Sequence, residues 1–391
     1  MGGEIRMKLI NAGIIGTGFI GPAHVEAVRR LGFVEVIALA EDSRTRAEEK
    51  AKELNIPLAY GDYRELLRNP EIQVIHNCTP NYLHYQITMD TLAAGKHIVS
   101  EKPLSMNETE SAKLVTAAKK ADRVNAINFN YRGYPLVQQA KQLIATGELG
   151  KIYLIHGSYL QDWLLYPTDY NWRLESKLSG TMRAIADIGS HWCDLVQYVS
   201  GIRIAEVYAD LKTVIPTRIR PKGIVETFKK ASGKKKQAGL TEKMNVDTED
   251  YGAVLLRFED RQRGVFLVSQ VSAGRKNRLW FEIDGSKSSL AWDQENPNDL
   301  WLGHREKPNE ILTKDPGLLT ESAKLYAHYP GGHPEGYPDG LKNLLHNVYQ
   351  DIRNGTSDGE YPKFIDGHRA MLLNAAILKS YKTKRWIKVK K

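Results

Sequence analysis

The stretch that decides the fold is GIIGTGFIGPAH, residues 13–24. An apolar run with strand character ends at Gly16, and AHVEAVRRLG (residues 23–32) follows with helical periodicity and a closing glycine. Gly16, Gly18 and Gly21 form G-x-G-x-x-G, which permits a tight turn, close approach of a pyrophosphate and close helix–strand packing. The N–H groups that begin the helix attract phosphates. The pattern therefore predicts a dinucleotide site at this strand–helix junction.

The second expected strand, EVIALAED (residues 35–42), places Glu41 about twenty residues beyond the glycines. A carboxylate there accepts hydrogen bonds from the adenosine ribose diol and repels a 2′-phosphate. Glu41 therefore favours NAD over NADP. Two alternatives stay open: Glu41 is only an exposed loop acid, or nearby Arg44 receives a phosphate.

Strands and helices alternate with short links in the first third of the chain, which indicates a doubly wound parallel sheet. One of these helices is expected to begin at Asn107 as N-cap, with Glu110 in the capping-box position. Beyond about residue 150, alternating apolar runs follow one another, which is typical of an antiparallel sheet. We predict a Rossmann dinucleotide-binding domain over residues 1–128. The remainder, residues 129–391, is predicted as an α+β substrate-binding and oligomerisation domain on a large, open, mostly antiparallel sheet.

The composition narrows the class of protein. The chain has 391 residues, a hydrophobic fraction of 42% and a charged fraction of 26%, which is typical of a globular protein of two domains. Only Cys78 and Cys193 are cysteines, which argues against a disulfide-stapled secreted fold. No apolar run reaches the length of a membrane span, and MGGEIRMKLI at the start lacks the apolar core of a signal peptide. We expect a cytoplasmic protein that does not bind membranes.

The net charge of +9 is concentrated in two places. Residues 216–243 carry nine lysines and arginines against two glutamates, and the last sixteen residues carry seven basic and no acidic side chains. A nucleic-acid surface is usually spread over a folded domain and interleaved with aromatic residues. The clustering favours a solvated loop and a basic terminus, and we expect no nucleic-acid partner.

Two later strand ends carry unusual residues: NCTPNYLH (residues 77–84) and SEKP (residues 100–103). In a doubly wound sheet, ligands bind outside the carboxyl ends of the strands. Thr79, Pro80 and Asn81 are expected along the ribose and nicotinamide side of the cofactor.

Lys102 is expected to project over the reacting substrate oxygen and to supply positive charge there. Glu101 would orient that lysine or bind a ribose hydroxyl, and Pro103 would fix the turn, with a cis bond as one possibility. The plain alternative is a surface Glu–Lys pair in front of a helix.

The second domain contributes ADIGSHWCDLVQYV, residues 186–199. Asp187 and His191 are four residues apart, so on a helix they share one face. Histidine is suited to take a proton from an alcohol near neutral pH, and a carboxylate can position it. The alternative is structural: Asp187 as an N-cap and His191 as a core residue.

The order G-x-G-x-x-G, T-P-N, E-K-P and D-x-G-x-H resembles the glucose–fructose oxidoreductase, inositol dehydrogenase and MocA family over nearly the whole chain. The resemblance implies that Lys102 contacts the substrate hydroxyl, that His191 is the acid/base and that Asp187 assists it. It also implies a homodimer or homotetramer. NWR (residues 171–173) and FNYRGYP (residues 129–135) look like family segments that line the cofactor and substrate. Residues 159–175 and EGYP (residues 335–338) are most similar to bacterial sugar dehydrogenases of the family.

We predict an NAD(P)-dependent dehydrogenase that oxidises a secondary ring hydroxyl of a sugar, anhydrosugar or cyclitol. The predicted catalytic residues are Lys102, Asp187 and His191. The predicted cofactor-binding residues are Gly16, Gly18, Phe19, Ile20, Gly21, Glu41, Thr79, Asn81, His84, Glu101, Lys102, Trp172 and Arg173. The predicted substrate-binding residues are Lys102, Tyr131, Tyr159, Trp163, Asp187 and His191, with Tyr166 and Trp172 as further candidate faces for a sugar ring.

Three rival functions remain on the sequence alone. The first is a glycosidase that reduces and reoxidises its NAD without net redox. The second is a cofactor-bound regulator without turnover, which an intact Lys102, Asp187 and His191 argues against. The third is a metal enzyme, because there are eleven histidines, but they are scattered and His333 in PGGHPEG suits a loop. No metal is expected.

Overall fold

The structure is a computed structural model that describes residues 9–221 and 241–390. Its internal contacts define two compact units. The first unit runs to Asn128 and includes Leu341–Gly367, and the second comprises Phe129–Gly340 and the chain from His368 onward. The domains expected from sequence, residues 1–128 and 129–391, place Leu341–Gly367 in the second domain, whereas in the structure these residues pack with the first unit. The roles expected of the two domains stay predictions. Most of the basic segment, residues 222–240, lies outside the described residues.

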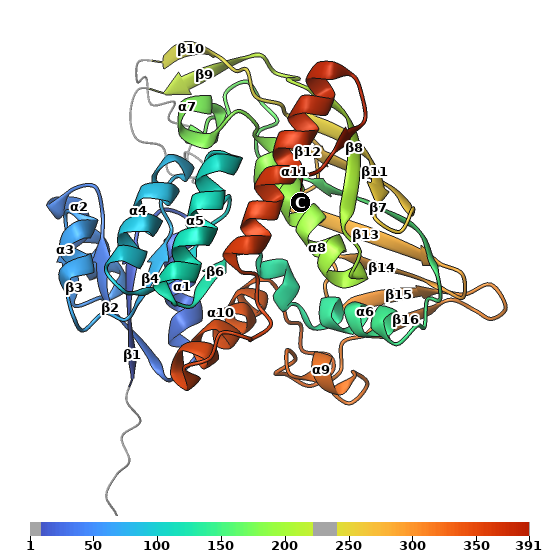
Figure 1. Cartoon of the computed structure of the whole chain (residues 1–391), viewed down its shortest axis with the longest axis horizontal. Coiled ribbons are helices and arrows are strands. Elements are labelled where there is room, and N and C mark those ends of the chain that lie inside the picture. The colour runs from blue at the N-terminus through green and yellow to red at the C-terminus, as the bar shows by residue number, and fades with distance from the viewer. Residues whose placement is uncertain (1–8, 222–240, 391) are drawn as a thin grey trace, which may run out of the picture. The chain divides into compact units, whose positions relative to one another are not determined.

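The first unit is built on a six-stranded parallel sheet in the order β3-β2-β1-β4-β5-β6, which confirms the doubly wound prediction (Figure 1). Its strands are β1 (Ile10–Ile15), β2 (Val34–Ala40), β3 (Leu58–Tyr60), β4 (Val74–Asn77), β5 (His97–Ser100) and β6 (Asn125–Ile127). The helices between them are α1 (Ile20–Arg29), α2 (Arg44–Leu54), α3 (Tyr63–Arg68), α4 (Asn81–Ala93) and α5 (Glu108–Ala121). The strand order reverses between β1 and β4, and ligands bind at such a switch point.

Both faces of this sheet are apolar, because successive residues of a strand point to opposite sides and both sides carry helices. Ile14 and Val74 belong to one core, and Ile15 and Ile75, their neighbours in sequence, belong to the other. Helix α10 (Tyr337–Asn354) completes the first of these cores. Its apolar residues recur at helical spacing and form one buried stripe of Leu341, Leu344, Leu345, Val348 and Tyr349. This stripe explains why Leu341–Gly367 belongs to the first unit.

The predicted capping residues of α5 are confirmed. The Asn107 side chain accepts a hydrogen bond from the Glu110 backbone N–H at 3.0 Å. The Glu110 carboxylate reaches back and accepts from the Met106 N–H at 3.1 Å. The reciprocal pair satisfies backbone donors that no turn of the helix can bond, which fixes where α5 begins after the E-K-P segment.

The second unit is built on a nine-stranded sheet in the order β16-β15-β14-β13-β7-β12-β11-β8-β17. Only the pair β7 and β12 is parallel, which confirms a large, mostly antiparallel sheet. Its strands are β7 (Ile152–Leu160), β8 (Ile204–Lys212), β11 (Tyr251–Phe258), β12 (Arg263–Ser269), β13 (Arg278–Gly285), β14 (Ser289–Asp293), β15 (Asp299–Gly303), β16 (Glu310–Thr313) and β17 (Ile387–Lys388). A separate two-stranded sheet joins β9 (Thr217–Pro221) and β10 (Thr241–Asn245).

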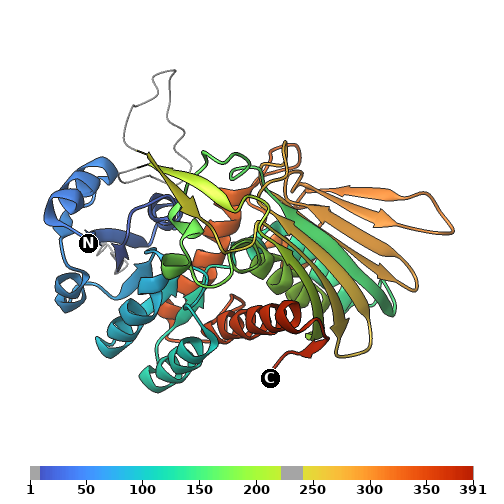
Figure 2. The ribbon, with the colours of Figure 1, turned by 90° about the horizontal axis from the view of Figure 1, so that it is seen from above.

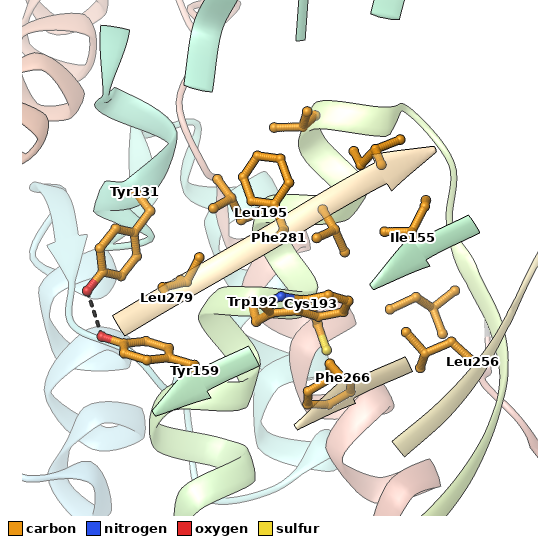
Figure 3. Close-up of a cluster of buried hydrophobic side chains, with 14 of the residues drawn as sticks. Tyr131, Ile155, Tyr159, Trp192, Cys193, Leu195, Leu256, Phe266, Leu279 and Phe281 are labelled. Atoms are coloured by element: carbon orange, nitrogen blue, oxygen red, sulfur yellow. Dashed lines mark hydrogen bonds between the residues drawn. The ribbon is translucent and has the colours of Figure 1, made fainter. Parts of the chain in front are cut away.

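Helices pack on one face of the nine-stranded sheet (Figure 2). The helical segments of this unit are η1 (Asn130–Gly133), α6 (Pro135–Ala145), η2 (Trp172–Leu174), α7 (Ser176–Ser179), η3 (Ile185–Gly189), α8 (Ser190–Ser200), α9 (Glu321–Lys324) and most of α11 (Phe364–Thr383). Trp192 of α8 stacks on Phe266 of β12 with ring centroids 4.8 Å apart, inside a large core of buried aliphatic and aromatic side chains (Figure 3). This core anchors α8, whose first turn carries His191.

The opposite face of this sheet keeps exposed apolar side chains. Leu154, Leu255 and Val265, from three adjoining strands, retain 36%, 48% and 39% of their surface. Within the described residues, no helix is both long and apolar enough to cross a membrane.

Candidate active site

The glycine loop after β1 has the backbone that a dinucleotide site requires. Gly16 has a φ of +85°, and a Cβ there would lie 2.9 Å from the Cys78 carbonyl oxygen. A Cβ on Gly21 would lie 2.4 Å from the Gly16 carbonyl oxygen. A Cβ on Gly18 would meet nothing within 4 Å, so the packing of the chain itself does not require this glycine. The open backbone at Gly18 fits a pyrophosphate approaching the loop.

The start of α1 also suits an anion. Phe19 is the N-cap and its apolar side chain offers no acceptor to the first-turn N–H groups. The first turn carries no acidic residue. Because the N-terminal end of a helix carries partial positive charge, this turn attracts phosphate oxygens. Phe19 itself is 54% exposed, beside Ile20 at the first helical position.

Glu41 lies at the end of β2 and is hydrogen-bonded to the glycine loop. Its Oε1 atom accepts from the backbone N–H and the hydroxyl of Thr17, each at 2.5 Å. Arg46 Nε lies 3.4 Å from the other oxygen, Oε2. Arg44, the alternative phosphate ligand, is engaged elsewhere, with Glu48 Oε1 and the Ala59 carbonyl oxygen at 2.7 Å each. A carboxylate fixed beside the loop fits a ribose diol and opposes a 2′-phosphate.

Replacing Glu41 with alanine is expected to shift cofactor preference toward NADP. The variant loses an acceptor for the ribose diol and releases the Arg46 guanidinium. A hydrogen bond to a charged group contributes roughly 1.5–3 kcal/mol, so the ratio of the Kd for NADP to that for NAD should fall roughly ten- to hundredfold. Calorimetric titration with both cofactors measures the ratio. Glu53→Ala, at a 59% exposed carboxylate that pairs with Lys50, is the matched control and should leave it unchanged. An unchanged ratio in Glu41→Ala would contradict the assignment.

The loop after β4 is held together by its own polar side chains. Thr79 Oγ1 donates to Asn77 Oδ1 at 2.7 Å, and Asn81 begins α4 with 7% of its surface exposed. The His84 ring nitrogens lie 2.8 Å from the Thr79 carbonyl oxygen and 2.6 Å from that of Pro103. His84 thus joins the loop after β4 to the E-K-P turn, and its expected direct contact with the cofactor stays a prediction.

The E-K-P turn follows β5, the neighbour of β4 in the sheet. The Lys102–Pro103 peptide bond is cis, one of the two isomers that the sequence leaves open. Glu101 is buried, with 7% of its surface exposed, and its Oε2 atom accepts from the Lys102 backbone N–H at 3.2 Å. The glutamate therefore faces inward and supports the lysine backbone, while the Lys102 side chain is only partly buried.

His191 lies in the first turn of α8 with 7% of its surface exposed. Three aromatic rings surround its imidazole, with centroids 5.0 Å away for Tyr131, 5.5 Å for Phe129 and 6.4 Å for Tyr159. The hydroxyls of Tyr131 and Tyr159 lie 2.6 Å apart (Figure 3). Burial raises the pKa of Tyr131 to about 12, so both hydroxyls stay protonated near neutral pH. The imidazole thus lies among apolar rings that carry hydroxyls at their edge.

Asp187 lies in the π-helical turn η3, immediately before α8. Gln270 Nε2 donates to its Oδ2 atom at 3.0 Å, and Arg173 Nε lies 3.4 Å from its Oδ1 atom. Arg173 is held in turn by its guanidinium above the Trp172 ring, 4.4 Å from the centroid. Arg173, a predicted cofactor-binding residue, therefore contacts the predicted catalytic carboxylate of Asp187. Trp172, from the same NWR segment, packs against Arg173. Short π-helical turns are frequent at functional sites.

Asn277 and Gln161 were missed by sequence reasoning. Asn277 Oδ1 accepts from the Tyr159 hydroxyl at 2.7 Å and from Gln161 Nε2 at 2.8 Å, and Asn277 Nδ2 donates to the Tyr131 hydroxyl at 2.9 Å. Trp163 Nε1 donates to Gln161 Oε1 at 2.8 Å, which links the predicted sugar-facing tryptophan to this network. Asn277 lies in a basic turn before β13 and carries no motif that could have singled it out.

The remaining candidates lie as follows. Tyr166 is 62% exposed and its backbone N–H donates to Asp169. His333 lies in an exposed loop, as its sequence suggests, with Nδ1 3.2 Å from the Gly331 carbonyl oxygen. Within residues 9–221 and 241–390, one group of side chains has the geometry to hold a metal ion: His156, Glu282 and Asp284. It lies on the sheet face opposite the helices and contains none of the predicted site residues.

A parallel sheet with a glycine loop at its switch point, followed in the chain by a second unit in which a buried imidazole comes four residues after an anchored carboxylate, is typical of a dinucleotide-dependent oxidoreductase. Residues 10–129 match the oxidoreductase family with an NAD-binding Rossmann fold, and residues 137–291 match the GFO/IDH/MocA C-terminal domain. The chain belongs to the GFO/IDH/MocA oxidoreductase family, which confirms the resemblance carried by the motifs.

The chain matches several relatives over almost its full length. It is 30% identical to levoglucosan dehydrogenase of Pseudarthrobacter phenanthrenivorans over 98% of this chain and 99% of that protein. A levoglucosan dehydrogenase structure in complex with NADH and levoglucosan matches with a TM-score of 0.88 at 28% identity, covering 98% of this chain and all of that one. An inositol dehydrogenase homologue complexed with NAD+ from Azotobacter vinelandii matches with a TM-score of 0.86 at 26% identity, covering 98% of both chains.

Proposed function

We propose that this enzyme oxidises a secondary ring hydroxyl of a sugar or anhydrosugar to a ketone, with NAD as the oxidant. The observation that carries the proposal is the buried imidazole of His191, which lies beside aromatic rings and follows the anchored carboxylate of Asp187 by one helical turn. Bound NAD would accept the hydride from the carbon that bears the hydroxyl. The hydroxyl proton goes to His191, so that one C–H and one O–H bond break and a C=O bond forms.

His191 would act as the general base. Phe129, Tyr131 and Tyr159 keep bulk water from its ring, which strengthens the interaction between the imidazole and any group beside it. The Asp187 carboxylate would stabilise the imidazolium that forms when the proton arrives. Gln270 and Arg173 each contact one oxygen of that carboxylate, so the carboxylate is already held in position before the substrate binds.

Lys102 would act on the same hydroxyl from the first unit. An ammonium group near the oxygen favours the alkoxide character that develops as the proton leaves. The Lys102 backbone N–H is held by the Glu101 carboxylate. The convergence of Lys102 and His191 on one oxygen is the central claim of this proposal.

The substrate class is inferred from the side chains of the second unit and from the relatives. Tyr131, Tyr159 and Trp163 present aromatic faces, and Asn277 and Gln161 add polar groups between them. Apolar faces with interspersed hydrogen-bonding groups suit a pyranose ring. Levoglucosan dehydrogenase, which matches this chain from end to end, makes an anhydrosugar the first substrate to test.

The exposed apolar residues on the open sheet face, Leu154, Leu255 and Val265, support self-association. Exposed apolar side chains that share one face of a sheet can mark an interaction surface. We propose that two copies pack face to face through this sheet, as a homodimer or as part of a homotetramer.

The test of the proposed activity is NADH formation from NAD with levoglucosan, myo-inositol and common free sugars, each assayed separately. NADH should accumulate with at least one of them, and the product should be a ketone. A glycosidase that recycles its cofactor would instead release free sugar from a glycoside without accumulating NADH. Failure of every sugar and cyclitol to reduce NAD would overturn the proposed function.

Replacing Asp187 with asparagine is expected to lower kcat roughly ten- to hundredfold, because the negative charge proposed to stabilise the imidazolium is lost while the shape of the side chain is kept. The Kd for NADH should change little. Asp293→Asn is the matched control, since Asp293 also pairs with an arginine Nε, that of Arg278 at 2.7 Å, and has 21% of its side chain exposed against 16% for Asp187. Equal kcat values for the two variants would show that Asp187 has only a structural role.

A further inference from the structure

A row of buried polar side chains runs through the first unit behind the E-K-P turn. Glu101 Oε1 lies 3.0 Å from His24 Nε2, His24 Nδ1 lies 2.8 Å from His76 Nδ1, and His76 Nε2 lies 2.7 Å from the Tyr349 hydroxyl. These residues come from the end of β5, from α1, from β4 and from α10. His24, His76 and Tyr349 have no exposed surface, and Glu101 has 7%.

The charges along the row determine which atoms carry protons. Burial alone would raise the pKa of Glu101, but hydrogen bonds from His24 and Asn128 and the positive charge of Lys102 hold the pKa below the ordinary range of a carboxyl, so the carboxylate is ionised. Burial, together with the neighbouring His24, holds the pKa of His76 well below its usual range, so His76 is neutral. Burial raises the pKa of Tyr349 well above its usual range, so the phenol keeps its proton.

With His24 neutral as well, one arrangement of protons satisfies the three contacts of the row. Glu101 can only accept, so His24 carries its proton on Nε2 and exposes Nδ1 as an acceptor. His76 must then donate from Nδ1, which leaves its Nε2 to accept the hydrogen bond from Tyr349. All three hydrogen bonds point the same way, from Tyr349 through His76 and His24 to Glu101. Bonds that share a direction polarise and strengthen one another.

The row ends at the backbone of Lys102. Glu101 Oε1 receives His24 and Asn128, whose Nδ2 donates at 2.5 Å, and Oε2 receives the Lys102 N–H at 3.2 Å. His24 therefore fixes the orientation of the Glu101 carboxylate through Oε1. The same carboxylate in turn fixes the Lys102 backbone through Oε2.

We propose that Tyr349, His76 and His24 are positioning residues for Lys102, acting through the Glu101 carboxylate. The proposal rests on the proposed function, in which Lys102 acts on the substrate oxygen. A row of polar groups in a core is expensive to bury and adds little stability over apolar side chains of similar size. Its contribution is to hold Glu101, and with it the Lys102 backbone, in a single orientation. Tyr349, which is remote in sequence from the E-K-P turn, therefore influences turnover.

The test compares Tyr349→Phe with Tyr361→Phe. Both variants lose one buried tyrosine hydroxyl of the first unit, since Tyr361 donates to Asp351 Oδ2 at 2.8 Å and belongs to the same core as Tyr349, yet Tyr361 has no part in the row. Tyr349→Phe should lower kcat about tenfold with an unchanged Kd for NADH, because a small displacement of a catalytic group lowers the rate more than it lowers binding. Tyr361→Phe should keep the wild-type kcat at a similar loss in Tm. Equal kcat values in the two variants would overturn the proposal.

Histidine nitrogen spectra of the 15N-labelled protein test the direction of the row without any substrate. The wild type should show His24 as the Nε2–H tautomer and His76 as the Nδ1–H tautomer, and Tyr349→Phe should change the His76 signals while Tyr361→Phe does not. The opposite tautomers in the wild type would overturn the row as described. If these spectra agree but no sugar reduces NAD, the proposed function fails and the hydrogen-bonded row stands.

A rescue experiment separates positioning from packing at His24. A glutamine amide can donate to Glu101 and accept from His76, whereas leucine can do neither. His24→Gln should therefore keep at least tenfold more kcat than His24→Leu at the same saturation with NAD. Equal losses of kcat in the two variants, with equal Tm, would contradict a positioning role.

Discussion

Replacing His191 with asparagine is expected to lower kcat by roughly 10²- to 10⁴-fold, the usual contribution of a general acid–base group. Asparagine keeps hydrogen-bonding groups near the ring position but cannot take up a proton near neutral pH. The aromatic surroundings of His191 should persist, because Asn277 hydrogen-bonds to the hydroxyls of both Tyr131 and Tyr159. Stopped-flow measurement of NADH formation with the best sugar gives the rate of the chemical step.

The control for this variant is His156→Asn. His156 belongs to the same unit and lies 3.4 Å from an aspartate oxygen, Asp284 Oδ2, but on the sheet face opposite the helices. It should keep the wild-type kcat and the wild-type Kd for NADH. If His191→Asn keeps more than about a tenth of the wild-type kcat, general base catalysis by His191 is wrong.

Replacing Lys102 with methionine is expected to lower kcat by roughly 10²- to 10³-fold, as the loss of one charge-stabilising group does in other enzymes. Methionine keeps the length of the side chain and removes the positive charge. The Kd for NADH should change much less than kcat, since the glycine loop and Glu41 are untouched. Lys102→Arg should recover only part of the rate, because a planar guanidinium cannot replace a compact ammonium.

Lys96→Met is the control for the loss of a lysine from the first unit. Lys96 is 7% exposed, and its Nζ donates to the Asn69 and Ile72 carbonyl oxygens at 2.8 Å and 2.6 Å. Its replacement should lower Tm while keeping kcat near the wild-type value below Tm. A Lys102→Met variant that keeps kcat would remove Lys102 from the mechanism.

The parts of the fold and site that sequence could predict are those encoded locally. Gly16 and Gly21 belong to one short motif. In the structure a side chain at either position would collide with nearby backbone atoms, so the requirement for glycine is local and steric. The Asn107 cap depends on residues at most a few positions away. Glu41 and Lys102 follow strand ends, the edge of a parallel sheet at which ligands bind, so the sequence singles them out as candidates.

The parts that sequence could not predict depend on contacts between distant segments. His76 and Tyr349 share a hydrogen bond although they lie 273 positions apart in the sequence. Taken alone, each residue of the row resembles an ordinary core or surface residue. Helix α10 follows the second sheet in sequence, and only its apolar stripe against the first core shows where it belongs. Asn277 has a role only because the sheet register brings β13 beside β7.

Glu101 is the clearest example of a residue whose role could not be decided from sequence. From sequence it had two possible roles, to orient Lys102 or to bind a ribose hydroxyl. The burial of its carboxylate and its bonds to His24, Asn128 and the Lys102 N–H favour the first. Burial is a property of the assembled sheet and helices, so no local pattern could have distinguished the two roles.

The most direct test is a crystal structure of the enzyme with NADH and the sugar that it oxidises fastest. We expect Lys102 Nζ and one ring nitrogen of His191 both to lie within about 3 Å of the same sugar hydroxyl oxygen. A complex in which the two side chains contact different hydroxyls, or in which one of them faces away from the sugar, would contradict it.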